Sequence, residues 1–543
     1  MTREVMDARG RNALRILGAT WPPEGALAAA GRPFDEDWAG AAGRTVQVSS
    51  PLTGAPIGQV PALGRHEVAG AALAARRAGA LWASRPLRER TRVLLAFHDL
   101  VWKHRDALLD LVQWESGKAR AHAFEEVADV AITARHLAHT AASRLRSERR
   151  TGVIPVLTRT EVHHHPKGVV GIIAPWNYPL ILTACDAMAA LVAGNAVILK
   201  PDSATPFTAL AVASLFHRAG LPSEVFQVLP GSGSVVGSAI VDEADAVMFT
   251  GSSPTGARVA ARAAARLVAA SAELGGKNPM VVRADAPVER TVRGAVKACF
   301  ANSGQLCVSI ERIYVNAQVW DRFVPAFVEA AGRVGVRATM EWTTAIGPLI
   351  TSAHARRVDA HVRDAVAKGA RVLTGGSFCP QASPDPSDPS AYLPTVLTDV
   401  TSAMEVFAEE TFGPVVSVYR VADDEEALRL ANASPYGLNA SVWSANATAA
   451  RALARRIRCG TVNVNEGYAA TWASPGAEMG GRGRSGLGRR HGREGLLKYT
   501  ETQSVSTQRL FGLQAPLGMG EEAWAHLMGT WLQVARHLPF LDR

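Results

Sequence analysis

One cysteine lies in a short polar turn where its thiol could act as a nucleophile. Cys307 closes the stretch 301–307, which follows the helical pattern of residues 290–300. A thiol attacks electrophilic carbon well once part of it is ionised, so a nearby base or local dipole could activate Cys307. A lone cysteine is nevertheless more often a small buried apolar residue. The nucleophile interpretation therefore depends on the residues that accompany Cys307.

Three other segments carry groups that such chemistry needs. Residues 273–276 place a carboxylate before Leu-Gly-Gly, and residues 171–180 end an apolar strand pattern in a turn that contains an asparagine. Residues 409–415 add two more carboxylates before Thr-Phe-Gly-Pro. Together with the cysteine segment, these motifs resemble the aldehyde dehydrogenase superfamily, in the family's order from about Val46 to Ser504.

The resemblance implies a role for each reactive residue. Cys307 would attack an aldehyde, the resulting alkoxide would pass two electrons to an oxidised nicotinamide, and water would hydrolyse the thioester that remains. Asn177 and the backbone N–H of Cys307 would stabilise the alkoxide, and losing one such donor typically costs about 2.7–4 kcal/mol. Glu273, 34 residues before Cys307, would be the general base for hydrolysis.

The resemblance also implies the residues that hold the cofactor. They are Trp176, Asn177, Lys200, Pro201, Asp202, Ser203, Gly233, Gly251, Ser252, Leu274, Glu410 and Phe412. Ser203 stands where many NAD-preferring members carry a glutamate that would repel a 2′-phosphate. NADP is therefore the expected cofactor, with NAD possible, and no metal is expected.

Within the superfamily, the chain most resembles bacterial NADP-dependent succinate-semialdehyde dehydrogenases, especially the actinobacterial second type. The matching phrases include residues 200–203, 305–307 and 488–492. The resemblance implies oxidation of succinate semialdehyde to succinate. The glutamate that commonly follows Gly-Arg in the family is Arg490 here, so the accessory proton-relay role of that glutamate is not expected.

The expected substrate pocket departs from that resemblance. Two arginines that hold the substrate carboxylate in well-known succinate-semialdehyde dehydrogenases correspond to Ala301 and Cys185. A buried carboxylate needs a cationic partner, for which Arg482 and Arg484 are the candidates. The alternatives are a general aliphatic or aromatic aldehyde dehydrogenase, a CoA-acylating dehydrogenase, which Glu273 disfavours, and a catalytically silent binding or structural homologue.

Apolar strand patterns alternate with helical patterns along most of the chain. From residue 168 to 275, and again from 274 to about 483, this alternation predicts an α/β fold with two doubly wound parallel-sheet domains. By resemblance, an arm of β-strands mediates oligomerisation. The expected divisions are a loosely structured leader (1–45), a dinucleotide-binding domain (46–145 and 168–274), a catalytic domain (275–483), an oligomerisation arm (146–167 and 496–510) and a C-terminal helical tail (511–543).

Composition is that of an ordinary globular protein. The 543 residues carry a formal charge of +9, 48% hydrophobic residues and five cysteines without metal-binding or disulfide-framework spacing. The three consecutive histidines 163–165 would point to alternate faces of a strand and make a poor metal site. We expect a cytoplasmic homodimer or homotetramer that acts on a small aldehyde and binds neither nucleic acid nor membrane.

Overall fold

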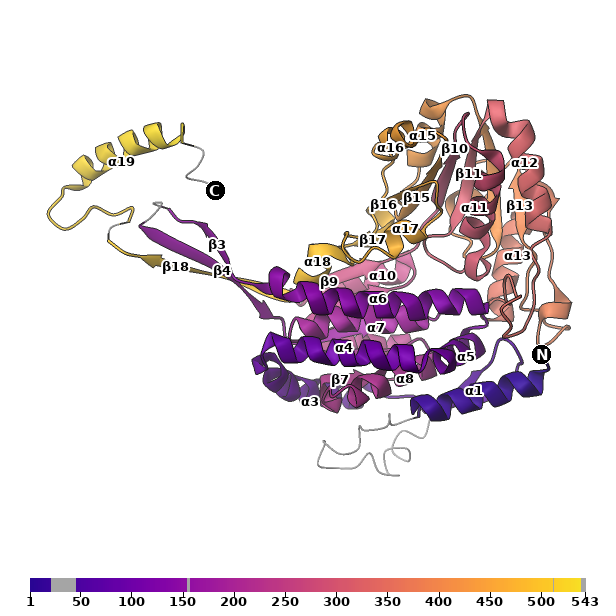
Figure 1. The fold of residues 1–543 in the computed structure, drawn as a ribbon, viewed down its shortest axis with the longest axis horizontal. Coiled ribbons are helices and arrows are strands. Elements are labelled where there is room, and N and C mark those ends of the chain that lie inside the picture. The colour runs from indigo at the N-terminus through magenta and orange to yellow at the C-terminus, as the bar shows by residue number, and fades with distance from the viewer. Residues whose placement is uncertain (21–44, 154–156, 511, 539–543) are drawn as a thin grey trace.

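Two mostly parallel sheets, each covered by helices, form the body of the molecule, and a narrow arm extends from it (Figure 1). The structure is a computed structural model and describes residues 1–20, 45–153, 157–510 and 512–538. The expected α/β architecture with two parallel-sheet domains is confirmed. Among the described residues, no helix combines the length and apolar character needed to cross a bilayer.

The first sheet is rich in Val, Ile and Leu because helices bury both of its faces. Its strands follow the order β17 (Gly486–Leu487), β9 (Ala269–Glu273), β8 (Ala246–Thr250), β5 (Val169–Ile173), β6 (Ala196–Lys200) and β7 (Phe226–Val228). All neighbours run parallel except β17, which is antiparallel to β9. The C-terminal part of the chain therefore returns to close the edge of this sheet.

Helices on both sides of the first sheet come from the N-terminal half of the chain. They are α3 (Arg65–Ser84), α4 (Leu87–Lys103), α5 (Arg105–Ser116), α6 (Arg120–Leu145), α7 (Pro179–Val192), α8 (Pro206–Arg218), α9 (Ser238–Glu243) and α10 (Ser253–Ala264), with the short helical turns η2 (Ser223–Val225) and η3 (Gly233–Gly237). A separate hairpin pairs β1 (Thr45–Ser49) with β2 (Pro56–Pro61).

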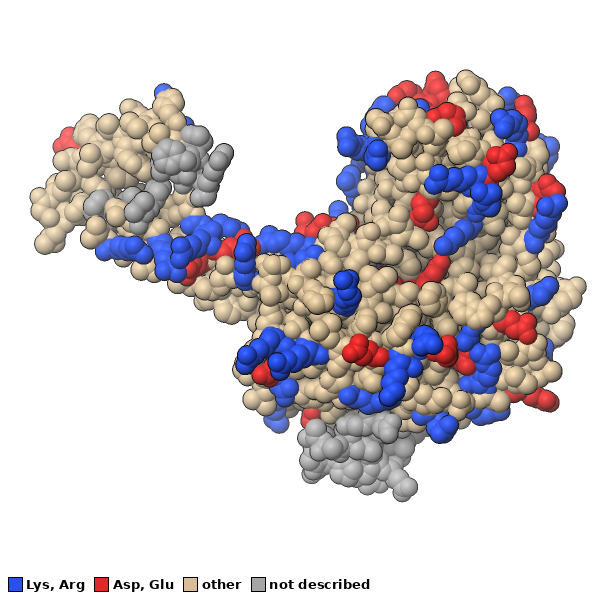
Figure 2. Space-filling view, viewed as in Figure 1, with Lys and Arg blue, Asp and Glu red and all other residues tan. Residues whose placement is uncertain are grey.

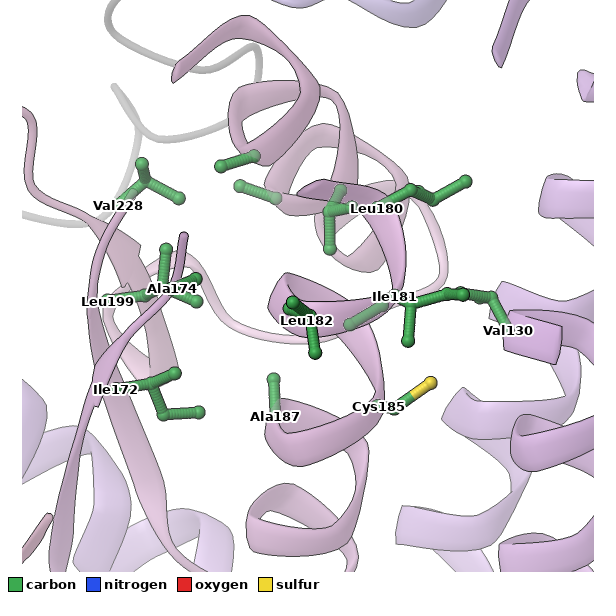
Figure 3. Close-up of a cluster of buried hydrophobic side chains, with 14 of the residues drawn as sticks. Val130, Ile172, Ala174, Leu180, Ile181, Leu182, Cys185, Ala187, Leu199 and Val228 are labelled. Carbon is green, nitrogen blue, oxygen red and sulfur yellow. The ribbon is translucent and has the colours of Figure 1, made fainter. Parts of the chain in front are cut away.

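Helix α7 is buried along its whole length between the sheet and α6. Its fourteen residues are all buried, as expected for an almost entirely apolar helix. Figure 3 shows Leu182 directed towards Ile172 of the sheet, while Ile181 and Cys185 lie on the face towards Val130 of α6. This packing fixes the turn before α7, which carries Asn177.

The second sheet follows the order β12 (Arg371–Thr374), β13 (Thr395–Thr398), β14 (Val415–Val421), β11 (Ile310–Asn316), β10 (Asn278–Val282), β15 (Asn439–Trp443) and β16 (Thr461–Val464). Only β12 is antiparallel to its neighbour. Its helical segments are α11 (Val288–Phe300), η4 (Ala301–Gly304), α12 (Ala317–Gly332), α13 (Ser352–Ala367), η5 (Pro380–Ala382), α14 (Glu405–Ala408), α15 (Asp424–Asn432), α16 (Ala447–Ala454) and α17 (Ala469–Trp472). After these come η6 (Gly483–Ser485) and α18 (Gly492–Leu497).

The arm is a three-stranded antiparallel sheet in the order β18 (Thr500–Gln508), β4 (Thr158–Pro166) and β3 (Glu148–Thr151). Strand β18 pairs with β4 over its full length and has no partner on its other edge among the described residues. Figure 2 shows Lys and Arg side chains along the arm. The exposed arginines of this segment include Arg149, Arg150, Arg159 and Arg509.

The expectation of a loosely structured leader is wrong for its first part. Helix α1 (Arg3–Leu17) begins with Thr2, whose hydroxyl accepts the Val5 N–H, and ends at the left-handed Gly18. It packs on α5, where Trp114 Nε1 donates to Asp7 at 2.8 Å. Gly10 is required there, because a Cβ on it would come within 2.0 Å of the Trp114 ring. The rest of the leader, residues 21–44, lies outside the described residues.

The described part of the tail contains the expected helix, α19 (Glu521–Ala535). Of its apolar residues, Trp524 is buried, whereas Leu527, Leu532 and Val534 are each more than half exposed. In Figure 1, α19 lies beyond the arm and away from the body. The tail helix therefore contributes little to the core of this subunit.

Candidate active site

The segment before Cys307 has an unusual backbone that its own side chains stabilise. Asn302, Ser303 and Gly304 have φ values of 50°, 57° and 72°, a left-handed run that is costly for the two non-glycine residues. Asn302 Nδ2 donates to the backbone oxygen of Gln305 at 3.1 Å, and Ser303 Oγ donates to the Gly347 oxygen at 2.7 Å. These contacts hold the turn that presents Cys307 between α11 and β11.

The electrostatic surroundings keep the Cys307 thiol protonated. Burial, together with the nearby carboxylate of Glu410, raises the pKa of Cys307 to about 12. Arg490 and a backbone hydrogen bond lower this pKa, but by less than burial and the carboxylates raise it. Any activation of Cys307 has to come from a change in its surroundings when the reactants bind.

Asn177 meets the cysteine segment directly. Its side-chain Nδ2 donates to the backbone oxygen of Gln305 at 3.2 Å, and its own backbone oxygen accepts from Asn302 Nδ2 at 3.1 Å and from Lys118 Nζ at 2.7 Å. Asn177 is buried. The amide of Asn177 is thus held against the backbone of Gln305, two residues before Cys307 in the chain.

Sequence reasoning missed the buried ion pair that supports this asparagine. Lys118 Nζ pairs with Glu126, and both side chains are fully buried. The other oxygen of Glu126 accepts the backbone N–H groups of Leu180 and Ile181, at 2.9 and 3.2 Å, in the first turn of α7. The only signal in the sequence was that residues 115–118, Glu-Ser-Gly-Lys, resemble a helix motif of the family and place a lysine at position 118.

Glu273 ends β9 and faces the site without a hydrogen-bonding partner. Its side chain is buried, and neither carboxylate oxygen accepts a hydrogen bond from any described residue. Burial raises the pKa of Glu273 to about 7, although the cations Arg490 and Lys498 lower it. A Cβ on Gly480 would come within 2.8 Å of Glu273 Oε1, so the glycine-rich segment 480–486 leaves room for the carboxylate.

Glu410 and Phe412 form the opposite wall. Glu410 Oε1 accepts the Gly276 N–H at 2.9 Å, and burial raises the pKa of Glu410 to about 8. The Phe412 ring packs edge-on against Trp176, with 5.6 Å between centroids. Lys277 and Glu311 form a second buried ion pair. The Glu311 carboxylate also accepts the backbone N–H of Phe412 and so fixes this wall.

Apart from Glu410 and Phe412, which precede β14 of the second sheet, the predicted cofactor residues follow strands of the first sheet. Lys200 is buried at the end of β6, and Ser203 Oγ donates to the Gly231 oxygen at 3.4 Å. Asp202 turns back and accepts the N–H of Ala204 within its own turn. Pro201 is buried in the same turn, Gly251 and Ser252 precede α10, and Leu274 packs on Phe249.

A cleft of about 610 Å³ opens beside these residues, between η3 and the first turns of α10. Gly233, Phe249, Val259 and Arg258 line it. Apolar walls suit a nucleoside base, and the free N–H groups at the start of α10 suit a phosphate. A Cβ on Gly233 would meet no atom within 4 Å. The residues present therefore fit a dinucleotide.

The expected carboxylate-binding arginines lie elsewhere. Arg482 and Arg484 are both exposed. The Arg484 guanidinium lies over the Tyr436 ring, 5.6 Å from the ring centroid. Arg482 lowers the pKa of Cys459, which is buried in the core of the second sheet, and not that of Cys307. Arg490, by contrast, is buried and pairs with Asp186 at 2.5 Å.

Comparisons with known proteins agree with this arrangement. The Aldehyde dehydrogenase family profile matches residues 38–505. A Mycobacterium ulcerans protein, provisionally named succinate-semialdehyde dehydrogenase [NADP(+)] 2, is 48% identical over 495 residues, which cover 91% of this chain and 95% of the relative.

Two solved structures are similar throughout the body. An NADP-dependent enzyme of E. coli has a TM-score of 0.81 and 33% identity, covering 86% of this chain and 95% of that one. Betaine aldehyde dehydrogenase of Staphylococcus aureus, solved with NAD+, has a TM-score of 0.81 and 30% identity, covering 86% and 92%. The chain therefore belongs to the aldehyde dehydrogenase family and is an NAD(P)-dependent oxidoreductase, as the motifs around Cys307 implied.

Proposed function

We propose that this enzyme oxidises an aldehyde to a carboxylic acid with Cys307 as nucleophile, Glu273 as general base and Asn177 as oxyanion donor. The observation that carries the proposal is the meeting of three distant segments. Asn177 bonds to the cysteine turn, and Glu273 lies near enough to Cys307 to affect the pKa of its thiol. Overall, an aldehyde, a water and oxidised NAD(P) yield a carboxylic acid, reduced NAD(P) and a proton, because the aldehyde hydrogen leaves with two electrons as a hydride.

Each residue has a defined task. The Cys307 thiol releases its proton to solvent as its sulfur bonds to the aldehyde carbon, while Asn177 Nδ2 and the Cys307 N–H donate to the oxygen that becomes negative. Bound NAD(P) supplies the two-electron acceptor that turns this adduct into a thioester. Glu273 then takes a proton from a water molecule as the oxygen of that water attacks the thioester carbonyl, and the Cys307 sulfur leaves as the thiolate. With a pKa of about 7, Glu273 suits a base at neutral pH.

Pre-steady-state kinetics test these assignments. Cys307→Ser should abolish formation of reduced cofactor. Glu273→Gln should give one rapid burst per site and then stall, because electron transfer precedes thioester hydrolysis. The burst is followed by cofactor absorbance, with wild type and the exposed Glu289→Gln as controls. A Glu273→Gln enzyme that keeps its full steady-state rate contradicts the base assignment.

Succinate semialdehyde is the proposed substrate and NADP the proposed cofactor. The names of the relatives support both. Three features support NADP. Ser203 adds no carboxylate that would repel a 2′-phosphate, Asp202 accepts a hydrogen bond within its own turn, and Lys200 could pair with the phosphate. The kcat/KM ratio for NADP and NAD measures this preference, and a tenfold advantage of NAD, about 1.4 kcal/mol, contradicts it.

A general aldehyde dehydrogenase is the second candidate, and one observation favours it. Near Cys307, Tyr178 packs edge-on against Trp472 at 5.9 Å, and Tyr468 packs on Trp472 at 6.3 Å. Such aromatic walls suit an uncharged aldehyde. Comparing kcat/KM for succinate semialdehyde with that for an uncharged aldehyde of similar length separates the two candidates.

We further propose a cytoplasmic homodimer or homotetramer assembled through the arm. All five cysteines are free, as in a reducing compartment. The open edge of β18 offers backbone groups to another strand. Light scattering of the intact chain and of a variant without residues 500–510 tests the assembly, and an unchanged mass contradicts it.

A further inference from the structure

Beside Glu273 lies a buried cluster of charges made by Asp186, Arg490, Lys498 and Tyr499. Asp186 Oδ2 accepts from Arg490 Nη2 at 2.5 Å. Its Oδ1 accepts from Tyr499 Oη at 3.2 Å, and Lys498 Nζ lies 3.5 Å from it. The side chains of Asp186, Arg490 and Lys498 are 3%, 8% and 14% exposed. One carboxylate thus anchors two cations in the interior.

This cluster has one positive charge more than it can balance by itself. Arg490 and Lys498 contribute two positive charges and Asp186 one negative charge. Two further buried carboxyl groups interact with these cations. Asp129 accepts from Cys185 and is influenced by Arg490, whereas Glu273 is influenced by both cations and has no hydrogen-bonding partner among the described residues. Ionised Glu273 completes a neutral set of two cations and two carboxylates, whereas protonated Glu273 leaves an uncompensated buried cation.

The groups that face Glu273 come from several elements. Arg490 and Lys498 flank α18, Asp186 lies on α7, and the half-buried Arg489 precedes Arg490. Cys307 and Tyr499 also face Glu273 and are neutral, because burial raises the pKa of both. Burial is the largest influence that raises the pKa of Glu273, and the charge of Asp186 adds to it, whereas the cations lower this pKa. The positive members outnumber the negative one, so the cluster as a whole favours the carboxylate.

We propose that Arg490 and Lys498, oriented by Asp186, are positioning residues that keep Glu273 ionised for its role as base. The proposal rests on the proposed function of Glu273. Neither cation hydrogen-bonds to Glu273: Arg490 also donates to Thr250 Oγ1 at 3.1 Å, and Lys498 to Ser271 Oγ at 3.4 Å. They act through the field that they create at the carboxylate rather than by contact with the reacting atoms.

Charge-changing variants of opposite sign give the sharpest test. Lys498→Met keeps the aliphatic stem and the Arg490–Asp186 pair but removes one positive charge, so the pKa of Glu273 should rise by roughly one unit or more. Asp186→Asn removes the negative charge, so that pKa should fall. Arg490→Lys keeps the charge and should leave the pKa close to that of wild type. Arg493→Met, an exposed arginine paired with Glu148, is the matched control.

The pKa of Glu273 can be titrated without turnover. The infrared carboxyl band that disappears in Glu273→Gln reports its protonation directly. The pH dependence of the steady-state rate after the burst should move in the same directions, with little change in the KM for aldehyde. A purely structural role would lower the rate in all variants without shifting the titration in opposite directions.

The outcomes separate this proposal from the proposed function. If Lys498→Met leaves the infrared pKa of Glu273 unchanged, the inference is wrong, and that variant decides alone if thermal melting shows that Asp186→Asn does not fold. If the pKa shifts as expected but Glu273→Gln retains its steady-state rate, the electrostatic role stands and the base assignment fails.

Discussion

The first turn of α7 and the end of β9 both bury a glutamate within the first domain, but they treat it in opposite ways. Glu126, on α6, packs against the first turn of α7, accepts two of its backbone N–H groups and pairs with Lys118. Glu273, at the end of β9, accepts no hydrogen bond from any described residue. A fully bonded buried charge fixes geometry, here that of Asn177. An unbonded one stores free energy that can be used in proton transfer.

Breaking the bonded site should have the largest effect. Glu126→Ala leaves the Lys118 ammonium buried without its carboxylate, and we expect a loss of about 3–5 kcal/mol in the free energy of unfolding. Urea denaturation measures it. Glu329→Ala, which removes a solvent-exposed partner of Arg333, should cost less than about 1 kcal/mol. Equal losses in the two variants would remove the distinction between bonded and exposed carboxylates.

Removing the group that Glu126 helps to position should affect rate rather than stability. Asn177→Ala deletes one oxyanion donor and should raise the barrier by about 2.7–4 kcal/mol, a loss in kcat of roughly 100- to 1,000-fold. Steady-state kinetics and thermal melting, measured together, check this. A loss of kcat below threefold would show that the Cys307 N–H suffices as donor.

The unbonded site should show the reverse effect on stability. The pKa of Glu273 is about 7 in the folded protein, against an ordinary value of 4.5, so the ionised carboxylate lowers stability above pH 7 and ceases to do so below about pH 4.5. Glu273→Gln should therefore be more stable than wild type at pH 8, by at most roughly 3 kcal/mol, and the difference should fall to about 1 kcal/mol at pH 5. Urea denaturation at both values tests the sign, with Glu289→Gln as control.

The smallest effect is expected at an exposed charge. Arg484 lies over the Tyr436 ring at the surface, where such a contact is worth about 0.5–1 kcal/mol. Arg484→Ala should change kcat/KM for succinate semialdehyde by less than threefold and should not alter the preference over an uncharged aldehyde. A selective tenfold loss would restore Arg484 as the group that binds the substrate carboxylate.

Much of this arrangement could be predicted because it is local in the sequence. Alternating strands and helices predicted the two parallel sheets, and the motifs around Cys307, Glu273 and Glu410 predicted the family. The buried pairs could not be predicted, since Lys118 with Glu126 and Lys277 with Glu311 become partners only when the helices and strands pack. The precise limits of the domains stay predictions.

The same reason explains one wrong expectation and one contact that was missed. The leader was expected to be loose because its composition hides the contact of Gly10 with Trp114, about a hundred residues away in the chain. The sequence shows that Arg490 replaces the usual glutamate but not that it pairs with Asp186, which lies 304 residues earlier. Tertiary contacts of this range leave no periodic signal in the sequence.

The return of the C-terminal segment to the first sheet sets the order in which the enzyme can mature during synthesis. Gly486 of β17 pairs with Glu273, and β18 pairs with β4, whose residues are made more than 330 positions earlier. The surroundings of Glu273, including Arg490 and Lys498, and the arm are therefore completed only once residues 486–508 have been synthesised. A nascent chain can form the parallel strands of both sheets before then, whereas the antiparallel edge beside Glu273 and the three-stranded arm form together at this later stage.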